Sequence, residues 1–122
     1  MKLVIAGSRH MSNDMACLIP EAIEFYTLEP TEIVCGMARG ADLLGKAWAE
    51  HQHIQVKEFP ADWEKYGKAA GPIRNKEMAL YCDAALVFIW DGSRGSANMV
   101  FNMQQLEKPC FVVENGVIHN ET

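Results

Sequence analysis

Short apolar runs that end at turn residues and alternate with amphipathic segments constrain this chain more than any other feature. The runs are continuous rather than alternating, which is typical of strands covered on both faces of a parallel sheet. The order of elements predicts a Rossmann-like, doubly wound α/β fold with about five parallel strands and helices on both faces. The strands are expected at residues 2–6, 32–35, 54–59, 84–90 and 110–114.

Apolar stripes at helical spacing predict four helices between these strands. Pro20 should kink the first helix or mark its true start. Residues 60–71 are interpreted as a loop because Pro60, Gly67 and Gly71 punctuate them. Residues 115–122 are interpreted as a turn and a short tail, and a length of 122 residues predicts one domain spanning 1–122. The helices are expected at residues 12–27, 40–51, 72–81 and 96–106.

Charge and composition exclude several function classes. The net charge of −5 weighs against a general binder of nucleic-acid backbones, since that affinity comes from Lys and Arg. Because no apolar run is long enough to cross a membrane, we expect a cytoplasmic protein. The four cysteines form no CxxC pair and are expected to be buried, reduced thiols. No zinc motif is present, so we expect neither a metal nor a cofactor.

The chemistry-bearing residues gather in the segments that follow the strands, where parallel sheets bind their ligands. Glycines between a strand and a helix let backbone N–H groups approach an anion, and the helix N-terminus favours negative charge. Arginines in or beside these loops suit phosphate or carboxylate; they are Arg9, Arg39, Arg74 and Arg94. The predicted ligand-binding residues are Gly7, Ser8, Arg9, Gly36, Arg39, Gly40, Asp42, Asp62, Trp63, Arg74, Asn75, Gly92, Ser93, Gly95 and Ser96.

Each of these residues also has a plainer interpretation. The glycines could serve tight turns without a ligand, and each arginine could be a solvated loop charge. Asp42 and Asp62 could bind ribose hydroxyls, act in catalysis or cap a helix. Trp63 and Trp90 could stack on a base, although Trp90 ends an apolar strand and suits the core better.

Taken in order, these loops are specific enough to indicate a family. The chain resembles the YspA-like branch of the SLOG superfamily over about residues 2–113, and members of that branch are bacterial and often phage-encoded. The resemblance implies a Rossmann-like fold with a pocket for nucleotides or nucleotide-derived ligands. It is carried by Gly7-Ser8-Arg9, by Gly36 with Ala38-Arg39-Gly40-Ala41-Asp42, by Phe59-Pro60-Ala61-Asp62-Trp63, by Gly67 to Asn75 with Met78, by Asp83, and by Gly92 with Gly95-Ser96-Ala97-Asn98-Met99.

A more distant similarity is to the Lonely Guy phosphoribohydrolases, which cleave the N-glycosidic bond of nucleoside monophosphates. Arg74 matches their arginine, and the loop from Gly92 to Ser96 matches their glycine loop. Their glutamate position falls on Met99, whose thioether cannot carry a proton. If the chain is a hydrolase, another acid must serve, and the candidates are Asp42, Asp62 and Glu77.

Three functions follow as hypotheses. The first is binding of a nucleotide-derived small molecule, either to sense it or to sequester it. The second is N-glycosidic hydrolysis of a nucleotide or NAD-like substrate. The third is binding of single-stranded nucleic acid, by analogy with the DNA-processing protein DprA, against which the net charge counts.

The expected helix 96–106 has two apolar stripes, one more than covering a sheet requires. Ala97, Val100 and Phe101 form one stripe, and Met99, Met103 and Leu106 form the other. An exposed second stripe would be an apolar patch of the kind that marks interfaces. The pattern therefore predicts a homo-oligomer, and Met103→Glu should weaken it if the methionine stripe is the contact.

Overall fold

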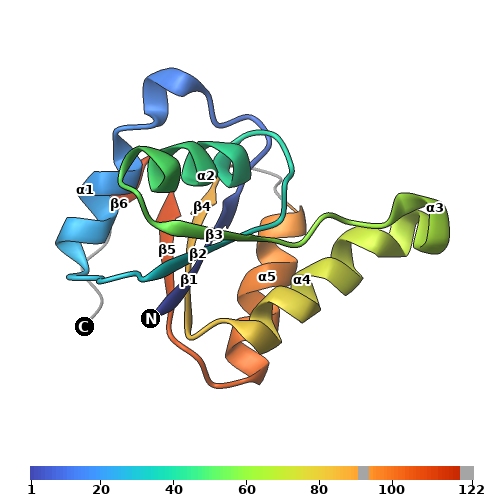
Figure 1. Ribbon diagram of the computed structural model, residues 1–122. Coiled ribbons are helices and arrows are strands. Elements are labelled where there is room, and N and C mark those ends of the chain that lie inside the picture. The colour runs from blue at the N-terminus through green and yellow to red at the C-terminus, as the bar shows by residue number, and fades with distance from the viewer. Residues whose placement is uncertain (91–93, 119–122) are drawn as a thin grey trace.

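The computed structural model describes residues 1–90 and 94–118. Within them, six strands form one sheet in the order β3-β2-β1-β4-β5-β6, and all neighbours are parallel except β5 and β6 (Figure 1). The strands are β1 (Lys2–Gly7), β2 (Glu32–Cys35), β3 (Gln55–Glu58), β4 (Ala84–Ile89), β5 (Cys110–Glu114) and β6 (Val117–Ile118). The predicted Rossmann-like α/β class is confirmed.

The sixth strand corrects the expectation that residues 115–122 form only a turn and a tail. Val117 and Ile118 pair with Glu114 and Val113 of β5 around a turn at Asn115 and Gly116. Both turn residues have positive φ, 49° and 79°, as a tight hairpin between twisted strands requires. Asn-Gly between two apolar runs is the sequence signal for such a hairpin, and the prediction missed it.

The helices pack on both faces of the sheet, as predicted. α1 (Leu18–Phe25) and α2 (Ala41–His51) cover one face, whereas α4 (Ala70–Tyr81) and α5 (Arg94–Gln105) cover the other (Figure 1). The expected helix 12–27 is shorter, because a 3₁₀ turn, η1 (Asn13–Met15), precedes α1. Pro20 is the third residue of α1, in the first turn, where its missing N–H costs no hydrogen bond.

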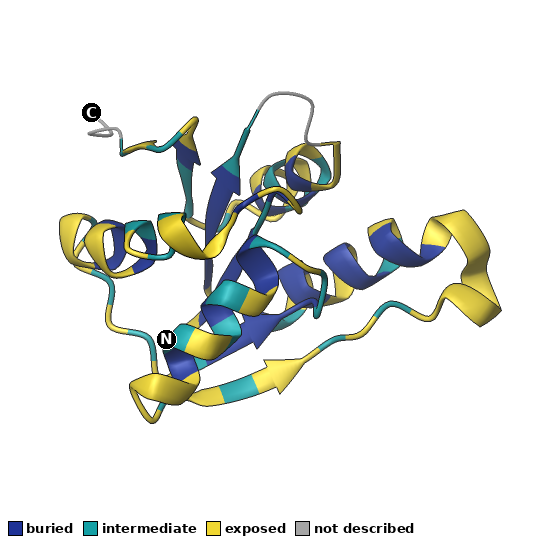
Figure 2. Cartoon of the chain, turned by 90° about the horizontal axis from the view of Figure 1, so that it is seen from above, coloured by how far each residue is buried: buried dark blue, intermediate teal, exposed yellow. Residues whose placement is uncertain are grey.

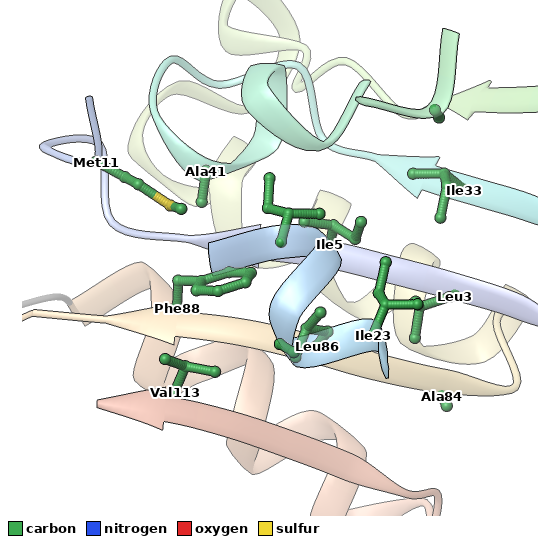
Figure 3. Close-up of a cluster of buried hydrophobic side chains, with 13 residues drawn as sticks. Leu3, Ile5, Met11, Ile23, Ile33, Ala41, Ala84, Leu86, Phe88 and Val113 are labelled. Carbon is green, nitrogen blue, oxygen red and sulfur yellow. The ribbon is translucent and has the colours of Figure 1, made fainter. Parts of the chain in front are cut away.

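Alternating side chains of the central strands divide the core into two layers. Leu3 and Ile5 of β1 point into a cluster under α1 and α2 with Phe88 of β4 (Figure 3). Val4 and Ala6 point the other way, into a cluster under α4 and α5. Burial on both faces explains why β1 and β4 are continuous apolar runs.

The segment expected to be a loop, residues 60–71, is mostly helical. It contains α3 (Trp63–Tyr66), the 3₁₀ turn η2 (Gly67–Ala69) and the first two residues of α4. Asp62 caps α3, since its Oδ1 accepts a hydrogen bond from the Lys65 amide at 3.1 Å. Gly67 follows α3 with a φ of 56°. The prediction interpreted Gly71 as part of the loop and began the helix at Pro72, whereas α4 begins two residues earlier and Pro72 lies in its first turn, as expected.

Methionines of α5 face inward, which corrects the proposed contact stripe. Met99 and Met103 are buried against the sheet, and Met103 has no exposed surface. Met103→Glu would therefore place a charge in the core and disrupt the fold rather than test association. The side chain of Phe101, on the opposite side of α5, is 55% exposed.

No helix among the described residues is both long enough and apolar enough to span a bilayer.

Candidate functional site

A cavity of about 280 Å³ opens at the carboxyl ends of β1 and β4. β1 and β4 are neighbours, yet the chain leaves β1 toward the α1 and α2 face and resumes after β4 in α5 on the other face (Figure 1). The strand order therefore reverses between them, which is where doubly wound sheets bind ligands. The loop after β1 is joined to β4 there, because the Ser8 amide donates to the Phe88 carbonyl at 2.8 Å.

The structure brings eight of the predicted ligand-binding residues to this cavity. They come from the loop after β1, from α2, from α4 and from α5, which are far apart in the sequence. Gly92 and Ser93 lie outside the described residues. The eight are Gly7, Ser8, Arg9, Asp42, Arg74, Asn75, Gly95 and Ser96.

Gly36 and Gly40 do not line the cavity but let its wall form. A Cβ on Gly36 would lie 2.7 Å from Oδ2 of Asp42 and 2.9 Å from Nη1 of Arg74. Gly40 has a φ of 86°, and a Cβ there would lie 2.3 Å from the Ser8 carbonyl oxygen. Only glycine allows these approaches, so the loop after β2 can pack against the loop after β1.

Four other predicted residues lie away from the cavity. Arg39 and Glu77 are exposed and do not line it, and Asp62 serves as the α3 cap. Trp63 lies at the start of α3, beside the first turn of α4. Of the three acids considered for catalysis, only Asp42 is therefore placed to meet a molecule in the cavity.

Arg74 is held at the cavity wall by hydrogen bonds within the protein. Its Nη1 donates to the Gly36 carbonyl, and its Nε donates to Oδ1 of Asn75 at 2.9 Å. Burial lowers the pKa of the guanidinium, which Asp42 opposes, but the group remains a cation. Two sides of the guanidinium are thus used, so a ligand would meet the remaining side rather than a free fork.

Asn75 links α4 to the start of α5. Its Nδ2 donates to the Gly95 carbonyl at 3.3 Å and to Oδ1 of Asn98 at 3.1 Å. The side chain is buried, and its amide oxygen is the acceptor for Arg74. Asn75 therefore positions Arg74 relative to the α5 N-terminus, and its own contact with a ligand stays a prediction.

Asp42 is a buried carboxyl group in the cavity wall. Burial raises its pKa to about 6, which the charge of Arg74 and the amides of Ala38 and Gly7 partly oppose. Its Oδ2 accepts from the Ala38 amide at 3.4 Å. Such a group gains or loses its charge close to neutral pH, where it can exchange a proton with a bound molecule.

Ser96 has a polar side chain that the protein leaves without a partner. Its Oγ is buried and makes no hydrogen bond with any of the described residues, and the residue lines the cavity in the first turn of α5. An unpaired buried hydroxyl costs about 1–3 kcal/mol, so the surrounding fold gains nothing from it. The first amides of α5 carry partial positive charge and lack helical partners. Together these groups suit an anionic oxygen acceptor.

The prediction missed several residues that line the cavity. His10 follows Arg9 directly, and Arg94 opens α5. The sequence analysis named Arg94 as a loop arginine but did not include it among the ligand-binding residues. Its position next to Gly95 was the signal that could have placed it in the site. Ala6, Ala38 and Met99 complete the wall as small or apolar groups. Met99, in the position of the Lonely Guy glutamate, brings no carboxylate to the cavity. Across residues 1–90 and 94–118, no three His, Cys, Asp or Glu side chains gather as a metal site would require.

Comparison with known protein families shows which family this chain belongs to. The model of the YspA, cpYpsA-related SLOG family matches residues 1–66, more than half of the chain. The chain belongs to this SLOG family. The match includes the loops after β1 and β2 and extends to α3, whereas Arg74, Asn75 and Ser96 lie beyond it.

A phage protein is similar to this SLOG family member. The Gene 61 protein of Mycobacterium phage D29 is 35% identical over 83 residues, which cover 63% of this chain and 66% of the relative. The SLOG fold also resembles the X-ray structure of DNA processing protein A from Streptococcus pneumoniae, with a TM-score of 0.73 and 20% identity. That alignment covers 91% of this chain but 49% of the other, so this chain spans about half of its structural neighbour.

Proposed function

We propose that this protein binds a phosphate-bearing, nucleotide-derived small molecule in the cavity at the ends of β1 and β4. The observation that carries the proposal is the buried, unpartnered hydroxyl of Ser96 in the first turn of α5. A phosphate oxygen there would accept from Ser96 Oγ and from the unpaired amides of the helix. Membership of the SLOG family supports a nucleotide-related ligand over an unrelated anion.

The charges that line the cavity support an anionic ligand. Arg9 and Arg94 are exposed at its rim, and Arg74 is buried in its wall. These cations gather in a chain with a net charge of −5, so the positive potential is local. A local basic site suits a small anion better than the long phosphate backbone of a nucleic acid.

The test measures ligand binding and stability for the same substitution. Titration calorimetry with adenosine 5′-monophosphate should show binding to the wild-type protein. Ser96→Ala should weaken that binding about tenfold while leaving the ligand-free protein equally stable or more stable, because an unpaired buried hydroxyl is removed. Equal affinity of wild type and Ser96→Ala would contradict the assignment of the phosphate to this helix end.

The second candidate function is N-glycosidic hydrolysis, and Asp42 favours it. This carboxyl group lies in the cavity wall with a pKa of about 6. Roughly a tenth of it is therefore protonated at pH 7, far more than for an ordinary aspartate. A protonated Asp42 could donate its proton to the departing base while water adds to the ribose carbon whose bond to the base breaks. Release of free adenine from adenosine 5′-monophosphate, followed by chromatography and abolished by Asp42→Asn, would establish this activity. Binding without adenine release would leave the sensing or sequestering function.

Binding of single-stranded nucleic acid is the third candidate function, and it can be tested alongside the other two. The neighbour of similar fold is named as a DNA processing protein, and its match to this chain concerns the fold. An oligonucleotide shift that weakens steeply with salt would indicate backbone contacts. We expect none, because the chain is acidic overall.

We propose further that residues 1–122 act as one cytosolic domain that self-associates. Both core clusters lie on the same sheet, which supports one domain. None of the four cysteines, all of which lie in the described residues, forms a disulfide, which supports a reducing compartment. Cys17 is exposed rather than buried as expected. The outward-facing Phe101 of α5 supports self-association, since a half-exposed phenyl ring gains free energy when covered.

A further inference from the structure

Trp63 is an exposed aromatic residue on the part of the molecule farthest from the sheet. α3 and the first turn of α4 project beyond the body at the right of both views, and α3 is coloured exposed (Figures 1 and 2). The Trp63 side chain is 51% exposed and belongs to neither core cluster. The Asp62 cap holds the turn that carries it. The indole is therefore presented on a short, capped helix without being used in the core.

The indole of Trp63 and the guanidinium of Arg74 both lie close to Gly71, in the first turn of α4. An atom placed where Gly71 lacks a Cβ would lie 3.5 Å from Cη2 of Trp63 and 3.9 Å from Nη2 of Arg74. Nη2 is the nitrogen that neither Gly36 nor Asn75 engages. Arg74 also lines the cavity, so its guanidinium connects the cavity to the exposed indole.

We propose that Trp63 stacks on the base of the bound nucleotide, which makes the ligand a purine nucleotide rather than a bare sugar phosphate. The inference rests on the proposed function. In this arrangement the phosphate lies against the first turn of α5, Arg74 Nη2 faces the middle of the ligand, and the base extends out of the cavity onto the exposed part of the indole. A purine covers more of an indole face than a pyrimidine does, and about half of the Trp63 surface is accessible to such a base.

Gly71 lets the indole lie close to the backbone of α4. The Cβ distances of 3.5 Å and 3.9 Å are ordinary van der Waals contacts, and Gly71 has no positive φ, so a small side chain fits there. Glycine is a poor helix former, and Gly71→Ala should therefore stabilise α4. A branched side chain at position 71 would instead fill the space between the indole and the guanidinium.

The experiment compares two ligands that differ only in the base. Titration calorimetry with adenosine 5′-monophosphate and with ribose 5-phosphate is carried out on wild type, Trp63→Leu and Trp63→Phe. The matched control is Tyr66→Leu, which removes the other exposed aromatic ring of α3. Circular dichroism and the thermal midpoint check that each variant is folded.

The expected result separates the base from the phosphate. Wild type should bind adenosine 5′-monophosphate at least about tenfold more tightly than ribose 5-phosphate. Trp63→Leu should lose that advantage and leave ribose 5-phosphate binding unchanged, whereas Trp63→Phe and Tyr66→Leu should keep most of it. Gly71→Leu should act like Trp63→Leu.

Two failures are distinguishable. If neither ligand binds wild type, the proposed function itself is wrong. If adenosine 5′-monophosphate binds wild type and folded Trp63→Leu equally, the cavity is a nucleotide site but Trp63 does not stack on the base. A change in sedimentation of Trp63→Leu with unchanged nucleotide affinity would also overturn the proposal, because the indole would then serve a protein contact.

Discussion

Asn75 accepts a hydrogen bond from the Nε of Arg74, its neighbour in the chain, at 2.9 Å. The same Asn75 side chain donates to the Gly95 carbonyl of α5. One buried amide thus fixes the orientation of the cavity's buried cation and its position relative to the helix end. A guanidinium held in this way loses little conformational entropy when an anion binds.

Arg74→Ala should weaken binding of adenosine 5′-monophosphate by about 1.5–3 kcal/mol, the range for a charged hydrogen-bond donor. Arg74→Lys should restore only part of this, because an ammonium group cannot replace both Nε toward Asn75 and Nη1 toward Gly36. Calorimetry measures both affinities. Full rescue by lysine would show that only the charge matters.

Gly95→Asp should abolish nucleotide binding and leave the fold intact. A Cβ at Gly95 meets nothing within 4 Å, and the residue is exposed at the start of α5. An aspartate suits a helix N-terminus but repels a phosphate there. Gly95→Asn, which has nearly the same shape and no charge, is the matched control and should bind at least tenfold better than Gly95→Asp. Equal affinities of the two variants would place the anion elsewhere.

Anion affinity should fall as pH rises through about 6, the pKa of Asp42. Below this pH Asp42 is neutral, and above it a carboxylate opposes the charges of Arg74 and Arg9 on a bound anion. Sulfate is the probe, since its own charge is constant in this range. Asp42→Asn should remove this part of the pH dependence. Its affinity for sulfate at pH 7.5 should match that of wild type at roughly pH 5, where Asp42 is mostly neutral.

His10 is the other ionisable side chain that must be separated from Asp42, because it also lines the cavity. His10→Asn is therefore measured beside Asp42→Asn. The prediction is wrong if His10→Asn flattens the pH profile of sulfate affinity and Asp42→Asn does not.

The raised pKa of Asp42 also determines how it affects protein stability at different pH values. The folded-state pKa exceeds the ordinary value of 3.8, so the contribution of Asp42 to stability falls as pH rises from about 4 to about 6.

Lys108→Met should lower the free energy of unfolding by about 1–3 kcal/mol. The Lys108 ammonium donates to the carbonyls of Ala79, Leu80 and Cys82 at 2.8, 3.0 and 2.7 Å, which closes the C-terminal end of α4. Lys76→Met, on the exposed side of α4, is the control and should change the free energy of unfolding by less than about 0.5 kcal/mol. Urea denaturation measures both, and equal stabilities would refute the capping role.

Self-association should depend on Phe101 rather than on Met103. Sedimentation of wild type at micromolar concentration should show a species larger than 13.6 kDa. Phe101→Glu should shift it toward the monomer without unfolding it, since this residue is exposed. A wild-type protein that sediments as a single 13.6 kDa species would defeat the proposal.

Much of the fold could be predicted because its signals are local. β1 and β4 are continuous apolar runs, since both of their faces are covered. The glycine-bearing loops follow these strands, and parallel strands place their carboxyl ends at one edge. The hairpin at Asn115 and Gly116 was equally local and was missed because the turn signal was not used.

The sequence by itself thus determined the α/β class, the edge of the sheet where the cavity lies, and the residue types gathered there. Only the tertiary structure decided which side chains meet. Residues 36 and 74 are 38 positions apart, and their hydrogen bond, together with that from Arg74 Nε to Asn75, occupies two sides of a guanidinium that spacing alone suggested was free. Packing likewise turned Met103 inward and left Ser96 Oγ unpaired. Periodicity is set by neighbours along the chain, whereas hydrogen-bond partners and burial depend on how whole elements pack in space.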